Sequence, residues 1–176
     1  MSQKKLTKIL GYCAAVFGIL AFAMMFLQAV TTGGDNPTTY KGFELAFGKV
    51  LGNIQWFGQK GEAKILFSFP ILLAYSLPLV AAVLFILTIA LKTKESKFIM
   101  GCIAFACFVC GIILLVLVRQ MATIELSTTL FSSKTTYNLE SYQLAIGAIL
   151  AIVFSSLGAC TAGSFAVIQL LNNKRK

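Results

Sequence analysis

Four long hydrophobic runs dominate the pattern of apolar and polar positions along the chain. They cover residues 9–30, 65–91, 98–118 and 144–171. Each run reaches the roughly 20 helical residues that are needed to cross a hydrocarbon core about 30 Å thick. The polar segments between them are residues 31–64, 92–97 and 119–143. The pattern predicts an all-α membrane protein, in which residues 1–176 form a single bundle of four transmembrane helices.

The last hydrophobic run carries small residues at four-residue spacing. They are Gly147, Ala151, Ser155, Ala159 and Gly163. Because lipid tails are as apolar as Leu, helices in a membrane associate largely through the close packing of such small residues. We therefore expect the fourth span to be the helix on which the others pack. Its expected neighbours are the first span and either the third span or a helix of another protein.

The first span repeats this feature with Gly11, Ala15 and Gly18, which predict a second close-packing face. Three lysines, an apolar core and Ala21-Phe22-Ala23 also imitate a secretory signal peptide. The apolar run, however, continues past that point to full spanning length. We expect an uncleaved membrane anchor.

The segment 31–64 begins with the turn-forming residues Gly33 to Pro37. After this turn, apolar side chains recur every three or four residues. They are Phe43, Phe47, Val50, Ile54 and Phe57. This spacing predicts a short amphipathic helix that lies on the membrane surface. A strand is the competing interpretation, since Phe43, Leu45 and Phe47 alternate with polar or small residues.

The segment 119–143 is rich in Thr, Ser and Asn. Residues 123–127 and 135–139 are expected to pair as a small hairpin around Ser132, Ser133 and Lys134. Together the two longer polar segments would form a small cap on one side of the membrane.

The distribution of charge predicts the orientation of the chain. The termini and residues 92–97 together carry nine Lys or Arg and one Glu, whereas the two longer segments carry six Lys or Arg and five Asp or Glu. Short loops that are rich in Lys and Arg remain in the cytoplasm. Both termini are therefore expected to be cytoplasmic in a multi-pass protein of the cell membrane. The net charge of +9 is then a topology signal with membrane lipids as partners, and nucleic-acid binding is not expected.

Two prolines and several hydroxyl groups mark the second span. Pro70 and Pro78 each remove a backbone donor and favour a bend. Ser68 and Ser76 lie beside them and could bond the freed carbonyl groups. These four residues define a candidate pathway or hinge. Together with the hydroxyl groups of Ser155 and Ser156 in the fourth span, they motivate the alternative of a small channel or carrier for a neutral or hydrophobic solute.

Residues that support catalysis are scarce. The chain has no His, no GxxxxGK phosphate-binding loop, and no ionisable residue near the middle of a predicted span. We expect no enzyme activity and no cofactor. Cys102, Cys107 and Cys110 could form a metal or thiol site on one helix face, but small apolar residues that fill a helix interface are the favoured interpretation.

The plan of four spans with a longer first outer segment and a tight inner turn is similar to that of claudin-type tetraspan proteins. In that family the first outer loop has a Trp-led motif and two cysteines, whereas here Trp56 has no cysteine in its loop. No functional residue therefore carries over. The small-residue faces instead favour a non-catalytic protein that acts by helix–helix association, either with itself or as a subunit or accessory of a membrane complex.

Overall fold

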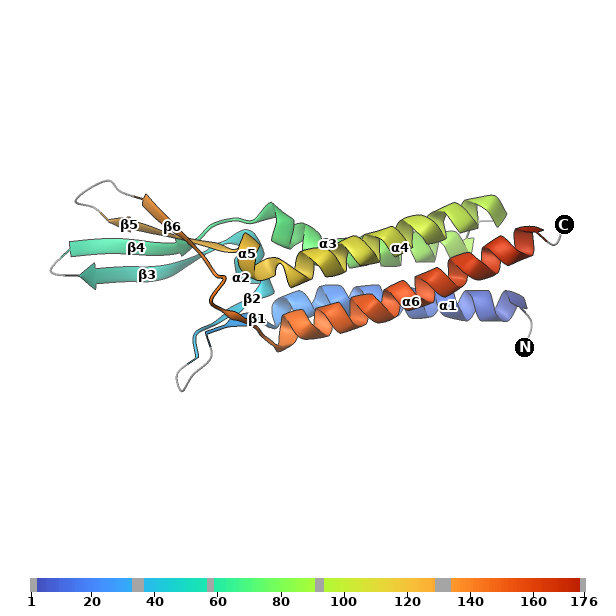
Figure 1. Cartoon of the computed structure of the whole chain (residues 1–176), viewed down its shortest axis with the longest axis horizontal. Coiled ribbons are helices and arrows are strands. Elements are labelled where there is room, and N and C mark those ends of the chain that lie inside the picture. The colour runs from blue at the N-terminus through green and yellow to red at the C-terminus, as the bar shows by residue number, and fades with distance from the viewer. Residues whose placement is uncertain (1–2, 33–36, 57–58, 91–93, 129–133, 175–176) are drawn as a thin grey trace.

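The computed structural model of the chain places four long helices side by side in one bundle (Figure 1). They are α1 (Gln3–Ala23), α3 (Phe69–Ala90), α4 (Lys94–Val116) and α6 (Ile146–Lys174). The structure describes residues 3–32, 37–56, 59–90, 94–128 and 134–174. Within these ranges, four helical segments are long and apolar enough to cross a membrane. The predicted turn at Gly33 to Pro37 lies largely outside the described residues.

The observed spans differ from the predicted ones mainly at the end of the bundle where the strands begin. The four segments are Lys5–Phe26, Phe69–Ile89, Ser96–Val116 and Ile146–Asn172. The first ends earlier than predicted because a 3-10 turn, η1 (Met24–Phe26), leads into strand β1 (Gln28–Thr31). The second begins later because residues up to Ile65 belong to strand β4. Hydropathy alone extended both predicted spans into the strand region, since buried strand residues are as apolar as helical ones.

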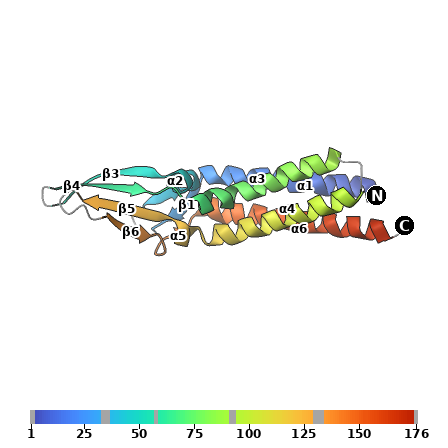
Figure 2. The same cartoon turned by 90° about the horizontal axis from the view of Figure 1, so that it is seen from above.

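Each long helix packs against two of the others around the bundle. Helices α1 and α4 each contact both α3 and α6. The fourth span therefore has the first and third spans as its neighbours, as predicted. The second span packs mainly on the first and third spans, so the fourth span is not the helix on which all the others pack. Both termini lie at one end of the bundle, which we call the terminal end (Figures 1 and 2). The strands lie at the other end, which we call the sheet end.

The strands correct the prediction that the protein is all-α with only a small cap. A short sheet of order β2-β1-β7 joins β1, β2 (Thr39–Lys41) and β7 (Gln143–Leu144). A long sheet of order β3-β4-β5-β6 extends well beyond the helices (Figure 1). Its strands are β3 (Lys49–Trp56), β4 (Gln59–Ile65), β5 (Thr123–Thr128) and β6 (Lys134–Asn138). Two segments that are distant in sequence thus build one antiparallel sheet.

The predicted surface helix is correct only for its first turns. Helix α2 covers Gly42–Phe47, and the chain then becomes strand β3. Gly48 ends the helix with a φ of 83°, and its N–H donates to the carbonyl of Glu44 at 2.9 Å. A side chain at Gly48 would come within 2.8 Å of the Ile65 carbonyl oxygen. The helix stops here because only glycine fits both the left-handed backbone and the approach of β4.

The second predicted element of this region, the hairpin of residues 123–127 and 135–139, is confirmed. Strands β5 and β6 pair antiparallel, with Glu125 opposite Thr136 and Ser127 opposite Lys134. Lys134 therefore belongs to the strand and not to the turn. A short helix, α5 (Val118–Met121), connects α4 to this hairpin.

Glycines that face aromatic rings set the close approach of the helices. The ring of Phe108 in α4 lies against Gly158 of α6, where an added Cβ would be 2.5 Å from it, and also against Gly18 of α1. In α6, the Phe165 ring packs on Gly101 and meets Phe85 edge to face at 5.3 Å. Alanines fill most of the remaining buried positions toward the terminal end. A large ring that occupies the space left by a missing side chain is thus the main packing unit here.

We predict that Gly158→Ala destabilises the bundle, because its Cβ has no room beside Phe108. Overpacking of this kind costs about 1–3 kcal/mol. Gly163→Ala in the same helix is the matched control, since its Cβ would meet Phe105 at an ordinary 3.5 Å. Thermal unfolding in detergent measures both, and equal stability of the two variants would contradict this account of the packing.

Candidate functional site

The small residues that the sequence marks on the fourth span lie mostly inside the bundle. Gly147, Ala151, Ser155 and Ala159 are buried, and Gly163 is half-buried. Gly147 faces the backbone of Leu27 and Gln28, where an added Cβ would be 2.6 Å from the Gln28 carbonyl oxygen. Residues spaced four apart drift gradually around a helix of 3.6 residues per turn, so Gly163, at the end of the series, lies nearer the surface.

Burial along α6 follows an alternating three- and four-residue spacing. The buried positions of this stripe are Ala148, Ala151, Ser155, Gly158, Ala162, Phe165 and Gln169. This is the period of helices that pack nearly parallel over their whole length. The four-residue row therefore missed Gly158 and Phe165, which a seven-residue repeat would have found.

The first span behaves in the same way. Gly11, Ala15 and Gly18 are all buried between α1 and its neighbours. Gly11 lies against Ile89 of α3, whereas Gly18 lies against the carbonyl oxygen of Pro78. The candidate packing residues of the first and fourth spans thus serve contacts within the chain.

The two prolines of α3 have different roles. Pro70 occupies the first turn of the helix, where a missing N–H removes no helical hydrogen bond, so no bend is required there. Pro78 lies inside the helix and is packed on two sides. Its carbonyl faces Gly18 and its ring faces Gly111 of α4, where an added Cβ would be 3.1 Å away. Packing between two glycines makes Pro78 part of a tight helix contact.

The hydroxyl groups of the candidate pathway mostly bond to nearby backbone. Ser76 donates to the Leu72 carbonyl at 2.8 Å, and Ser156 donates to the Ile152 carbonyl at 2.8 Å. Ser68 donates to the carbonyl of Met121 at 3.2 Å and so ties the start of α3 to α5. Ser155 is buried and has no hydrogen-bond partner among the described residues. Hydroxyls that bond back to their own helix do not line a shared polar path.

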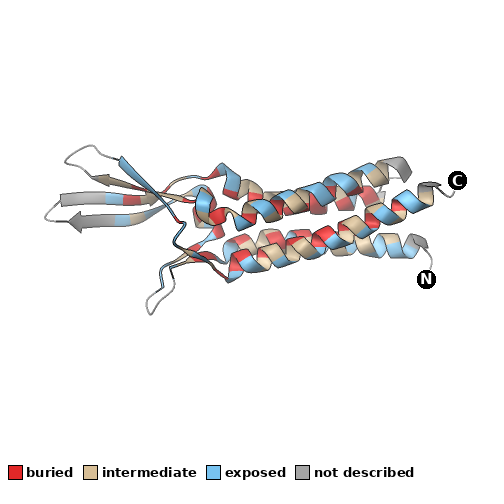
Figure 3. Cartoon of the chain, in the orientation of Figure 1, coloured by how far each residue is buried: buried red, intermediate tan, exposed pale blue. Residues whose placement is uncertain are grey.

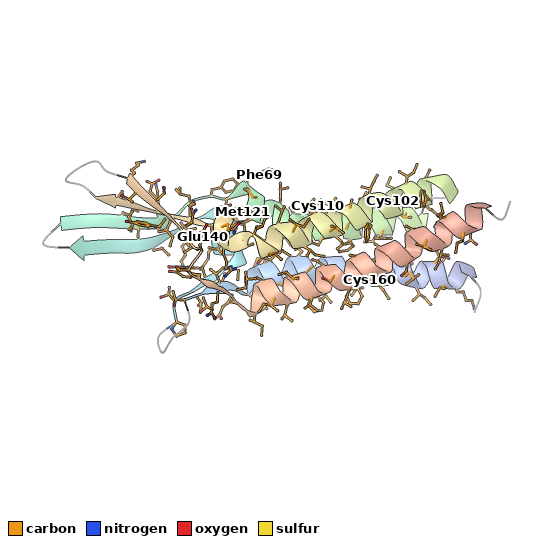
Figure 4. All side chains as sticks on the ribbon, in the orientation of Figure 1. Phe69, Cys102, Cys110, Met121, Glu140 and Cys160 are labelled. Atoms are coloured by element: carbon orange, nitrogen blue, oxygen red, sulfur yellow. The ribbon has the colours of Figure 1, made fainter. Side chains whose placement is uncertain are left out.

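The three cysteines of α4 do not converge. Cys102 and Cys110 are exposed on the surface of the bundle (Figure 4). Cys107 is half-buried. Within the ranges that the structure describes, no group of three His, Cys, Asp or Glu side chains is placed to hold a metal ion.

Exposed phenylalanines surround α2 at the sheet end of the bundle. The Phe43 ring stacks on Phe26 at 6.0 Å and meets Phe47 at 4.7 Å. The opposite face of α2 is buried, with Gly42 against the ring of Tyr75. This short helix thus places a patch of phenylalanine rings at the boundary between the apolar spans and the strands.

A charged row crosses one face of the long sheet. Glu125 in β5 lies 3.4 Å from Lys64 in β4 and 3.4 Å from Lys134 in β6. Burial alone would raise the pKa of the Glu125 carboxyl, but the two lysines outweigh it and hold this pKa below its ordinary value of 4.5. The row therefore connects three strands by ion pairs at neutral pH.

The opposite face of the long sheet is more apolar. The register places Ile65, Ile124 and Tyr137 in one row, and Ala63, Leu126 and Thr135 in the next. Ile65 and Ile124 contact the core at the sheet end. Farther along, β6 is exposed at every residue (Figure 3). The long sheet is therefore the largest feature of the fold that the bundle does not cover.

Comparison of the chain with protein-family models, curated proteins and solved structures finds no match. The fold nevertheless defines a class, since four apolar helices characterise a multi-pass membrane protein. The candidate site is then the exposed sheet carried by those helices.

The sequence predicted only two of the four strands of this sheet. The residues of β5 and β6 alternate in a way that indicates strands. The glycine-rich segment that becomes β3 and β4 also fits a helical period, so its strands were not predicted.

We predict that the charged row responds to acid only below the ordinary range of a carboxyl group. The lowered pKa of Glu125 means that its stabilising contribution is complete above the unfolded-state value and is lost as the pH falls through the folded-state value. The protection factors of the β5 and β6 amides, which correct for the intrinsic pH dependence of hydrogen exchange, should therefore be equal at pH 7 and 5 and smaller at pH 3. Glu125→Gln should remove this difference, whereas Glu140→Gln, at an exposed position outside the sheet, should retain it. Loss of protection already at pH 5 would contradict the assignment.

Proposed function

We propose that this protein is a non-catalytic membrane protein that binds another protein through its long sheet. The four-helix bundle serves as the anchor that holds the sheet at the membrane. The observation that carries the proposal is the exposure of β6 along its whole length, on a sheet that projects beyond the helices. A sheet edge with unpaired backbone groups is a ready template for a further strand.

The arrangement of the bundle supports this choice of contact surface. The small residues that favour helix–helix association are occupied by contacts within the chain, as between Gly158 and Phe108. The exposed positions of α6 are instead mainly bulky, with Val153 and Leu157 as examples, which suits contact with lipid. Association through the spans therefore has less support than association through the strands.

A channel or carrier has less support still. The centre of the bundle holds the fully buried rings of Tyr75, Phe85 and Phe108, and two of the four candidate hydroxyls bond to their own helices. The association hypothesis requires no pathway through the bundle and is consistent with this filled interior.

Charge supports an orientation in which the terminal end is cytoplasmic and the long sheet lies outside the cell membrane. The termini and the segment 92–97 hold most of the excess Lys and Arg, and such segments stay inside. The nearly balanced charge of the two longer segments suits export across the membrane.

The orientation predicts which positions react with a membrane-impermeant maleimide on intact cells. A cysteine introduced by Ser127→Cys in β5 should be labelled from outside, whereas one introduced by Gln3→Cys should be labelled only after the cells are opened. The parent protein, with its five native cysteines, is the background control. The reverse pattern would overturn the orientation.

The binding proposal predicts that a photo-crosslinking amino acid at Tyr137 in β6 captures a protein in intact membranes. The same amino acid at Val153, on the lipid-exposed surface of α6, should capture none. Gel mobility and mass spectrometry of the purified adducts provide the measurement. If neither position yields a protein adduct, the proposed function is wrong.

A further inference from the structure

The two edges of the long sheet differ in how open they are. Strand β6 is one edge, and among the described residues only β5 forms backbone hydrogen bonds with Lys134–Asn138. All five residues of β6 are exposed, and its pairing with β5 has no irregularity. The outward backbone groups of β6 thus form a straight, unpaired row. Such a row can be completed by the backbone of another strand.

Strand β3 is the other edge, and its geometry discourages pairing. Its register with β4 shifts between Val50 and Gly52, which marks a bulge. Gly52 has a φ of 133°, a conformation that takes the chain away from a regular strand. Bulges twist an edge and are a common means of protecting it from further pairing. Only β6 is therefore ready to accept a partner strand.

The sequence of β6 is complementary to itself. When two copies are laid antiparallel with all five residues overlapping, Thr136 faces Thr136 of the other copy. Lys134 then faces Asn138, and Thr135 faces Tyr137. β-Branched and aromatic residues are favourable cross-strand neighbours, and no like charges face each other. Lys134 also remains free to pair with Glu125 of its own chain, since both lie on the polar face of the sheet.

We propose, on the basis of the function proposed above, that the protein bound by β6 is a second copy of this chain. The two β6 strands pair antiparallel about Thr136 and join two long sheets into one continuous sheet. Because a twofold contact uses the same edge on both copies, and β3 is blunted, assembly stops at the dimer.

The direction of the strands determines how the two copies are placed. The strands of the long sheet run roughly along the length of the helices (Figures 1 and 2). An antiparallel β6 pair therefore directs the two bundles away from each other, at opposite ends of the joined sheet. Copies side by side in one membrane would instead present β6 strands in parallel. The dimer consequently suits contact between two facing membranes.

Disulfide crosslinking of the full-length protein in detergent distinguishes these arrangements. Directly opposed residues in an antiparallel pair have Cβ atoms about 4.5–5.5 Å apart, close enough for a disulfide with little adjustment. Thr136→Cys should therefore crosslink to itself. A mixture of differently tagged Lys134→Cys and Asn138→Cys chains should form the mixed dimer above the level at which the parent protein forms any dimer, whereas Lys134→Cys alone should stay at the parent level.

Charge substitution gives a test that does not depend on oxidation. Thr136→Lys and Thr136→Glu should each reduce dimer formation, because like charges then face each other across the axis, and mixing the two variants should restore it. Thr136→Ser is the control that should retain the dimer. Thr136 also lies opposite Glu125 of its own chain, so the thermal unfolding of each variant is measured as well. An unchanged unfolding temperature shows that a loss of dimer comes from the contact between the two copies.

Other outcomes overturn the inference in distinguishable ways. Self-crosslinking of Lys134→Cys in place of the mixed dimer would indicate parallel copies in one membrane. A different protein captured at Tyr137, without self-adducts, would overturn the second copy as partner while leaving the proposed function intact. No adduct of any kind would overturn both.

Discussion

The close approach of helix backbones is the constraint on which the rest of this structure depends. Hydrophobic burial contributes little to helix association in lipid, so contact must come from packing. Here the packing is achieved by pairing a large ring with a missing side chain, as Phe108 does with Gly18 and Gly158. The same logic explains Pro78, whose ring and carbonyl lie against glycines of two other helices. An internal proline is retained because its neighbours leave room for it.

This mode of packing leaves the two parts of the molecule, the bundle and the long sheet, with different surfaces for contact with a partner. The bundle uses most of its small residues internally and presents mainly bulky side chains to its surroundings. The long sheet keeps an edge and parts of both faces uncovered, with the charged row through Glu125 connecting its strands. A partner therefore meets an ordered, hydrogen-bonding surface at the sheet end. The helices provide its position and orientation.

The elements differ in how well the sequence predicted them, for physical reasons that can be stated. The hairpin of β5 and β6 was recognised because its apolar and polar residues alternate and its strands are neighbours in sequence. Strand β3 was taken for a helix because Val50 and Ile54 recur at a helical period, while its strand partner is defined only by register. Gly48 is the residue at which the helix ends, but the reason for a glycine at this position is seen only in the structure, where β4 packs close to its backbone.

The sequence by itself determined that four segments are long and apolar enough to cross a membrane as helices, because length and hydropathy are properties of each segment alone. It also marked close-packing surfaces on the first and fourth spans. Only the tertiary structure decided which side chains pack on those surfaces, since a ring such as that of Phe108 must reach a glycine on another helix. The tertiary structure also decided that residues 49–65 form two strands. The backbone groups of β4 form hydrogen bonds with β5, which lies far along the chain, and no local sequence pattern could predict that pairing.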